Sequence, residues 1–131
     1  MLTQKTLTLL IDVSENTTVG TVSFYGMRGY LRKAQIVSPA LDGADTYTFA
    51  IADEHSQTMF SLATIAESIT KTIPVAGDVA LTQAWFTNAV FFQEDPTQPA
   101  GTITITASGV QTADRTFTIR LWFEETGLFV A

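Results

Sequence analysis

The chain has 131 residues, a length that predicts one domain able to bury a single hydrophobic core. Hydrophobic residues make up 46% of the chain and charged residues 15%, a composition that excludes an intrinsically disordered protein. The sequence has no cysteine, which excludes disulfides, thiol chemistry and cysteine-based zinc sites. The net charge of −6 argues against general binding to nucleic acid or to an anionic membrane, since both need a broad basic surface.

The N-terminal stretch MLTQKTLTLLIDV is not expected to be a signal peptide. Its apolar run is short, contains threonines and ends at Asp12 without a small-residue cleavage site. The sequence also contains no run of about eighteen apolar residues, so we expect no membrane-spanning segment. The sequence therefore predicts a soluble domain that is not processed.

Threonine alternates with apolar residues along much of the chain, a pattern typical of half-buried β-strands. Taken in chain order, strands are expected at residues 5–13, 19–25, 30–37, 46–54, 58–62, 68–75, 101–108 and 115–125. The segment 79–93 is apolar on both faces, which predicts a central strand pair or one long bent strand.

Turn-forming stretches separate these segments, namely SENTTVG, PALDGAD, QEDPTQPAG and ASGVQTAD. Seven to nine short strands at this spacing predict an all-β fold, an antiparallel β-sandwich of jelly-roll type that takes in residues 1–131 as one domain. In the stretch SLATIAESI the apolar residues also fit helical spacing, so at most one short helix is expected, at about residues 62–69.

The single histidine, His55, lies beside Asp53 and Glu54. This group could form a metal site or a general base with its carboxylate, but neighbouring residues of a strand or turn point in different directions. We therefore predict a solvated turn. The other acidic pairs, Glu94–Asp95 and Glu124–Glu125, lack EF-hand spacing and are expected at solvated strand ends, with a structural ion as the alternative.

The sequence offers no set of residues with catalytic roles. The serines lack the G-x-S-x-G setting of a nucleophile elbow, and neither GMRGY nor SGVQ has the glycine spacing of a phosphate-binding loop. We therefore predict no catalytic residue, no cofactor and no metal, and a protein that is not an enzyme.

Several aromatic residues are expected to lie off the core. Trp122 alternates with the residues of the apolar face of its strand and shares the other face with Thr118 and Arg120. Trp85 with Phe86, and Phe91 with Phe92, are adjacent pairs whose members point to opposite faces of a strand. Such residues fit a protein interface, a sugar-binding platform or a strand buried on both sides. We predict an interface, with burial within the chain as the open alternative.

The stretch FYGMRGYLRKAQIVSP holds three of the seven basic residues, Arg28, Arg32 and Lys33. With Tyr25 and Tyr30 nearby they could bind a nucleic acid, but three charges on an acidic protein bind a polyanion weakly. They could also decorate a sheet edge or a loop. We predict instead a docking patch for an acidic partner or for another acidic subunit, where charge sets register and association rate.

Three stretches resemble a class of small structural proteins of tailed bacteriophages: GYLRKAQIVSPALDGADTYTFAIADEHSQTMFS, IPVAGDVALT and AGTITITASGVQTADRTFTIRLWFEE. The shared features are a basic strand after glycine and an aromatic residue, a Tyr-Thr strand that ends in acidic residues, a proline-glycine turn, and a closing threonine-rich hairpin. The resemblance extends from about Gly29 to Glu125. The class of phage proteins that the chain resembles includes capsid decoration, or cement, proteins.

The resemblance implies a jelly-roll-like protein, commonly trimeric, that binds the outside of an icosahedral head and bridges capsomers without catalysis. The implied partners are the major capsid protein and further copies of the chain, and the implied location is the virion surface after synthesis in the host cytoplasm. We expect polar docking by Arg28, Arg32 and Lys33, and apolar contacts by Trp85, Phe91, Trp122, Leu128, Phe129 and Val130.

Residues 1–5 and 127–131 are expected to form short arms that pack against neighbours, because a free apolar tail would promote aggregation. Two alternatives to the decoration protein stay open. One is a carbohydrate-binding or receptor-binding β-sandwich module, and the other is a tail or adaptor protein of the virion.

Overall fold

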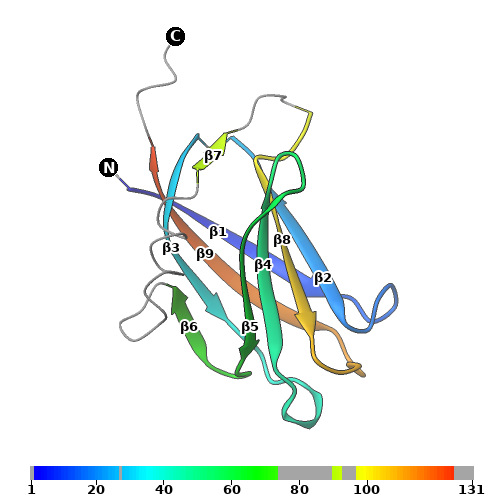
Figure 1. The fold of residues 1–131 in the computed structure, drawn as a ribbon. Coiled ribbons are helices and arrows are strands. Elements are labelled where there is room, and N and C mark those ends of the chain that lie inside the picture. The colour runs from blue at the N-terminus through cyan, green and yellow to red at the C-terminus, as the bar shows by residue number, and fades with distance from the viewer. Residues whose placement is uncertain (1, 27, 74–89, 93–96, 126–131) are drawn as a thin grey trace.

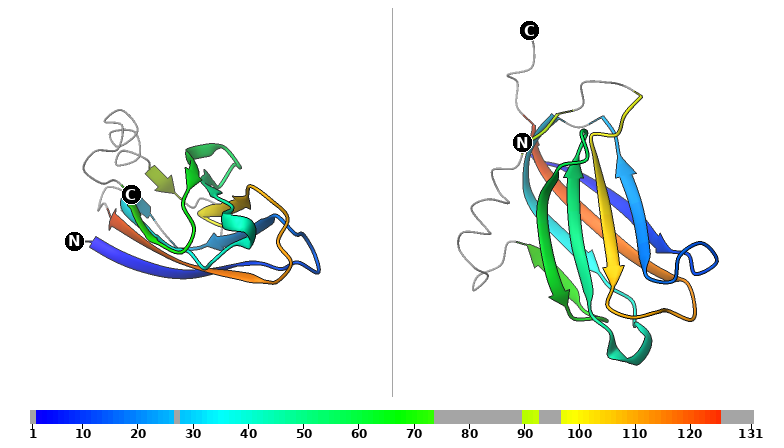
Figure 2. Two further views of the ribbon diagram at one scale, coloured as in Figure 1. Left: turned by 90° about the horizontal axis from the view of Figure 1, so that it is seen from below. Right: turned by 45° about the vertical axis from the view of Figure 1, so that its right-hand side comes forward.

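The computed structural model describes residues 2–26, 28–73, 90–92 and 97–125. Within these residues the chain forms two antiparallel β-sheets and one 3-10 turn at Asp42–Ala44. The two sheets face each other as the layers of a sandwich (Figures 1 and 2).

Sheet 1 has the strand order β1-β9-β3-β6, and β7 also pairs with β3. Its strands are β1 (Leu2–Ile11), β9 (Arg115–Glu125), β3 (Arg28–Val37), β6 (Thr70–Ile73) and β7 (Val90–Phe92). Sheet 2 has the order β2-β8-β4-β5. Its strands are β2 (Val19–Phe24), β8 (Gly101–Ala107), β4 (Tyr47–Asp53) and β5 (Thr58–Ile65).

The pairing pattern is that of a jelly roll. With β7 set aside, the first strand pairs with the last, β1 with β9, and the second pairs with the next to last, β2 with β8. The inner pairs are β3 with β6 and β4 with β5. A chain folded once into a long hairpin and then rolled into two facing sheets gives this order. The prediction of an all-β, antiparallel, jelly-roll-like sandwich is confirmed.

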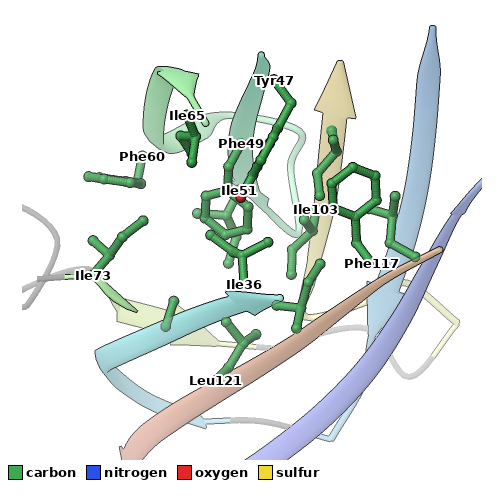
Figure 3. Packing of buried hydrophobic residues seen from close by; sticks show 14 of the residues in the cluster. Ile36, Tyr47, Phe49, Ile51, Phe60, Ile65, Ile73, Ile103, Phe117 and Leu121 are labelled. Carbon is green, nitrogen blue, oxygen red and sulfur yellow. The ribbon is translucent and has the colours of Figure 1, made fainter. Parts of the chain in front are cut away.

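The hydrophobic core lies between the sheets and follows the alternation read from the sequence. On β9 the inward residues Phe117, Ile119, Leu121 and Phe123 are all fully buried. On β4 the inward residues are Tyr47, Phe49 and Ile51, and Figure 3 shows them facing Ile36 and Leu121 of sheet 1. Threonine recurs at the outward positions, as at Thr102, Thr104 and Thr106 of β8, where a β-branched side chain suits the solvent face of a strand.

Strand pairing decides the local structure of two stretches. The expectation of at most one short helix is met: residues 62–69 form none, because β5 continues to Ile65 and the chain then turns into β6. Ser68 in this turn has a φ of 59°, which is left-handed, and Thr64 has the same φ at a register shift of β5 opposite β4. Residues 2–5 do not form an arm but are the first part of β1, paired with β9. The second expected arm, residues 127–131, and most of the segment 79–93 lie outside the described residues.

Among the residues that the structure describes, Tyr47 is the largest fully buried side chain. Its ring lies edge-on to the ring of Phe117, with 5.1 Å between the centroids. Among the described residues its hydroxyl has no hydrogen-bond partner, although the atom is inaccessible to solvent. An unpartnered buried hydroxyl destabilises a fold, since it loses its hydrogen bonds to water without replacement.

Tyr47→Phe removes this hydroxyl and keeps the contact between the rings. We expect the free energy of unfolding at neutral pH to stay the same or to rise by about 1 kcal/mol. Urea unfolding at constant m-value measures the change. A loss of more than about 1 kcal/mol would show that the hydroxyl is hydrogen-bonded in solution.

The same variant should change the stability of the protein at high pH. Burial raises the pKa of the Tyr47 phenol above its ordinary value of 10.0. A pKa raised by folding gives stability that is present below the unfolded value and is lost as pH rises through the folded one. The wild-type chain should therefore lose stability above pH 10 more steeply than Tyr47→Phe, as thermal unfolding at a series of pH values can show. Equal slopes would contradict this.

Candidate functional site

A β-bulge in β3 determines what the outer face of sheet 1 presents. Opposite β9, Leu31 pairs with Phe123 and Lys33 pairs with Trp122, so Arg32 is the extra residue. In a regular strand Arg32 and Lys33 would point to opposite faces. The bulge lets Leu31 and Ala34 stay in the core while both cations project from the outer face.

The two cations rest on aromatic rings of the same face. The guanidinium carbon of Arg32 lies 4.8 Å from the ring centroid of Tyr30, and its Nε donates a 2.7 Å hydrogen bond to Glu124 Oε1. The ammonium nitrogen of Lys33 lies 4.7 Å from the ring centroid of Trp122. Both distances are within the range of cation–π attraction.

A third cation lies on the next cross-strand row. Arg120 Nη1 donates a 3.1 Å hydrogen bond to Gln35 Oε1, and these two residues are register partners. We call this outer surface of β3 and β9 the cationic face; it consists of Tyr30, Arg32, Lys33, Gln35, Arg120, Trp122 and Glu124.

The cationic face has a net positive charge on a negatively charged protein. Glu124 offsets the charge of Arg32, although both side chains are partly exposed and such pairs contribute only about 0.2–1 kcal/mol. Among the described residues neither Lys33 nor Arg120 forms an ion pair with a carboxylate. Their positive charges are therefore available to a negatively charged partner.

The structure brings together three of the residues predicted to make contacts, Arg32, Lys33 and Trp122. Trp122 is half-buried on the outer face and is not part of the core. Arg32 and Lys33 lie within β3, which pairs with β9 along one side; on the other side β7 pairs with Arg28–Tyr30 and β6 with Ala34–Val37, so no described strand pairs with β3 there at Arg32 and Lys33. The backbones of Arg28 and Phe91 lie in β3 and β7, but the structure does not describe their side chains. Trp85, Leu128, Phe129 and Val130 lie outside the described residues.

A second polar cluster, which was not predicted, lies where four loops meet at one end of the sandwich, the lower end in Figure 1. We call it the loop end; it consists of residues 12–18, 38–46, 66–69 and 108–114, with Arg115 at the start of β9. At its centre is Gln111, only 1% exposed. Its Oε1 accepts hydrogen bonds from Asp42 N and Arg115 Nε, and its Nε2 donates to Asp45 Oδ2 and to the Gly109 carbonyl.

Further contacts join the loops to one another. Asp42 forms an ion pair with Arg115 and accepts a 2.9 Å hydrogen bond from Thr112 N. The hydrogen bond from Thr112, with a further contribution from the charge of Arg115, lowers the pKa of Asp42. Asp114 Oδ1 accepts from Val13 N, and Glu67 Oε1 accepts from Leu41 N. The four loops are thus one hydrogen-bonded unit.

His55 lies in the exposed turn between β4 and β5, as predicted, with 70% of its side chain exposed. Its Nε2 is 3.7 Å from Glu54 Oε1, while Asp53 Oδ1 accepts hydrogen bonds from the backbone of His55 and Gln57. Within the described parts of the chain, no three acidic, histidine or cysteine side chains are grouped to hold a metal ion. No helix there is long and apolar enough to cross a membrane.

Replacing Gln111 by leucine tests the role of the loop end in stability. The variant leaves the N–H groups of Asp42 and Arg115, and two acceptor oxygens, without their buried partner. We expect the free energy of unfolding to fall by about 2 kcal/mol or more in urea titrations. The control Gln57→Leu, in the exposed turn, should change it by less than about 0.5 kcal/mol. Equal effects would show that the network does not stabilise the fold.

Comparisons with known proteins find only weak likenesses. No protein-family model matches the chain, and no curated protein matches it. A serine protease of Aeromonas sobria aligns over 95% of this chain and 27% of its own, with 8% identity and a TM-score of 0.48. The complex of that protease with its chaperone gives a TM-score of 0.46 at 8% identity, over 96% of this chain and 28% of the matched one.

Two further structures come from viruses. A virus-like particle of the extra small virus of the prawn Macrobrachium rosenbergii aligns over 95% of this chain and 81% of its own, with 12% identity and a TM-score of 0.30. Infectious bursal disease virus, Gt strain, gives 8% identity and a TM-score of 0.29 over 95% of this chain and 30% of its own. The chain thus spans about a quarter of the protease and most of the prawn virus chain. At these TM-scores none of the likenesses bears on function.

Proposed function

We propose that the chain is a non-catalytic structural protein of a bacteriophage virion, a head decoration protein that binds the capsid exterior between capsomers. The observation that carries this proposal is the cationic face. There a bulge places two consecutive cations beside Tyr30 and Trp122 on a hydrogen-bonded sheet.

The composition of this face suits docking to a protein. Tyrosine, tryptophan and arginine are the residues that most often dominate the binding energy of interfaces. They are fixed here on β3 and β9, two inner strands of sheet 1, so little conformational entropy is lost when a partner binds. Lys33 and Arg120 would orient an acidic partner and speed its association.

The resemblance of residues 29–125 to phage decoration proteins supplies the biological setting of the proposal. The partners would be the major capsid protein and further copies of the chain, arranged as a trimer on the virion surface. A jelly roll tied together at its loop end is a stiff spacer for such a role. A tail or adaptor position in the virion would use the same face in the same way.

A carbohydrate-binding module is the second candidate, because Trp122 has polar neighbours on its face, among them Gln4 and Gln35. A sugar that stacked on the indole would compete with Lys33, whose ammonium group already lies over the ring. This contact favours the docking of a protein. Binding of a glycan would persist at high salt, whereas docking by exposed cations would weaken.

The test is cosedimentation of the purified chain with capsid shells of the phage that encodes it. Trp122→Ala and Lys33→Ala should each reduce the affinity about fivefold or more without lowering the unfolding temperature, because both residues lie on the outer face. The control Thr116→Ala, at the far end of the same face, should bind as the wild type does.

Two results would contradict the proposal. Unfolding of Trp122→Ala would show that this residue supports the core, and unchanged binding of both variants would show that the face does not dock. A glycan array that gives hits insensitive to salt would favour the carbohydrate-binding module instead.

A further inference from the structure

The loop end is strongly acidic. Its four loops contain six carboxylates and no lysine or arginine: Asp12, Glu15, Asp42, Asp45, Glu67 and Asp114. Arg115, the first residue of β9, pairs with Asp42. Nearly half of the thirteen acidic residues of the chain therefore lie at this one end, where a single arginine offsets them in part.

Most of these carboxylates are held in place by the loops themselves. Asp12 accepts hydrogen bonds from the N–H and the hydroxyl of Ser14, and Asp114 accepts one from Val13 N. Such neutral donors orient a carboxylate, but they do not cancel its charge. Glu15 is exposed on the outside of the first loop. The loop end is thus a fixed, negatively charged surface.

Exposed apolar side chains accompany this charge. Val110 is 63% exposed in the loop 108–114, and Ile69 is 47% exposed in the loop 66–69. The loop of Val110 is joined to the loop of Glu15, because Gln111 N donates a 2.9 Å hydrogen bond to the Thr17 carbonyl. The loop end therefore combines negative charge with exposed apolar side chains, and the cationic face combines positive charge with aromatic rings. The two surfaces are complementary in charge and both offer apolar contacts.

The two surfaces of one chain cannot meet. Along β9, Trp122 on the cationic face is seven positions after Arg115 at the loop end, about 23 Å of extended strand. Both surfaces belong to one sandwich, with the cationic face on the outside of sheet 1 and the loop end where the connections between strands meet. The surfaces can pair only between different molecules.

We propose that the loop end of one copy of the chain docks on the cationic face of a second copy. This inference rests on the proposed function in that it names the acidic partner of the face. The contact joins two different surfaces, so each added copy leaves one face and one loop end unused. Copies therefore continue into a closed ring or an open row, according to the angle between neighbours.

Two charge-reversal variants test the pairing. Each variant weakens one of the two surfaces and leaves the other intact. Lys33→Glu reverses a charge of the cationic face, and Glu15→Lys reverses an exposed charge of the loop end that is not needed to hold the loops. His55→Glu, in the exposed turn of sheet 2, controls for a change of net charge outside both surfaces. Sedimentation velocity over a range of protein concentrations measures the mass of each species.

At low ionic strength the wild type and His55→Glu should self-associate with rising concentration, and added salt should reverse this, since the Debye length shrinks from about 30 Å at 0.01 M to about 10 Å at 0.1 M. Each reversal alone should weaken self-association about fivefold or more. An equimolar mixture of the two variants should form dimers with the affinity of the wild-type contact, because it pairs an intact loop end with an intact face.

A wild type that stays monomeric at every concentration, or a mixture that associates no better than its separate variants, would overturn the inference. If capsid shells nevertheless bind the wild type better than Lys33→Glu, the proposed function stands and the face docks on another virion protein. If the mixture dimerises but capsid shells bind no variant and no wild type, the self-pairing stands and the proposed function falls.

Discussion

The pairing of β3 with β9, with one extra residue at Arg32, is the constraint on which the rest of the molecule depends. Inward, this pairing places Leu31, Ala34 and their β9 partners in the core, where they are fully buried. Outward, it places Arg32 and Lys33 on one face over two aromatic rings. Without the bulge, one of the two cations would face the hydrophobic core and lose its hydration. The same irregularity therefore protects the core and creates the cationic face.

At the loop end the charges are negative, and the loops must be held together against their repulsion. Four connections meet there, and all of their charged residues are carboxylates, which repel one another. The carboxamide of Gln111 holds the loops together: its oxygen accepts two hydrogen bonds and its nitrogen donates two, one of them to Asp45. Asp42 pairs with Arg115, which offsets part of the negative charge. Fixed loops at one end and a fixed face on sheet 1 give the protein two rigid surfaces of opposite charge. Rigid, complementary surfaces are what a protein needs for docking without catalysis.

The sequence predicts the sandwich because apolar residues alternate with polar residues, often threonine, along much of the chain. It also predicts Trp122 on an outer face and His55 in a solvated turn. It could not predict the bulge, because the extra residue shows only when β3 is paired with β9. The helical spacing at residues 62–69 does not give a helix, because pairing with β4 extends β5 through Ile65. The role of Gln111 stayed hidden because two of its partners, Asp42 and Asp45, are 69 and 66 residues away from it in the sequence.

The central claim is that the cationic face becomes covered when the protein docks. Acrylamide quenching of Trp122 fluorescence, in a Trp85→Phe background, measures the access of solvent to this face directly. Quenching of the free protein should be substantial, because Trp122 is only half-buried. We expect it to fall clearly when the protein is bound to capsid shells or associated with itself at low salt. Quenching that stays the same in both bound forms would contradict docking through the cationic face.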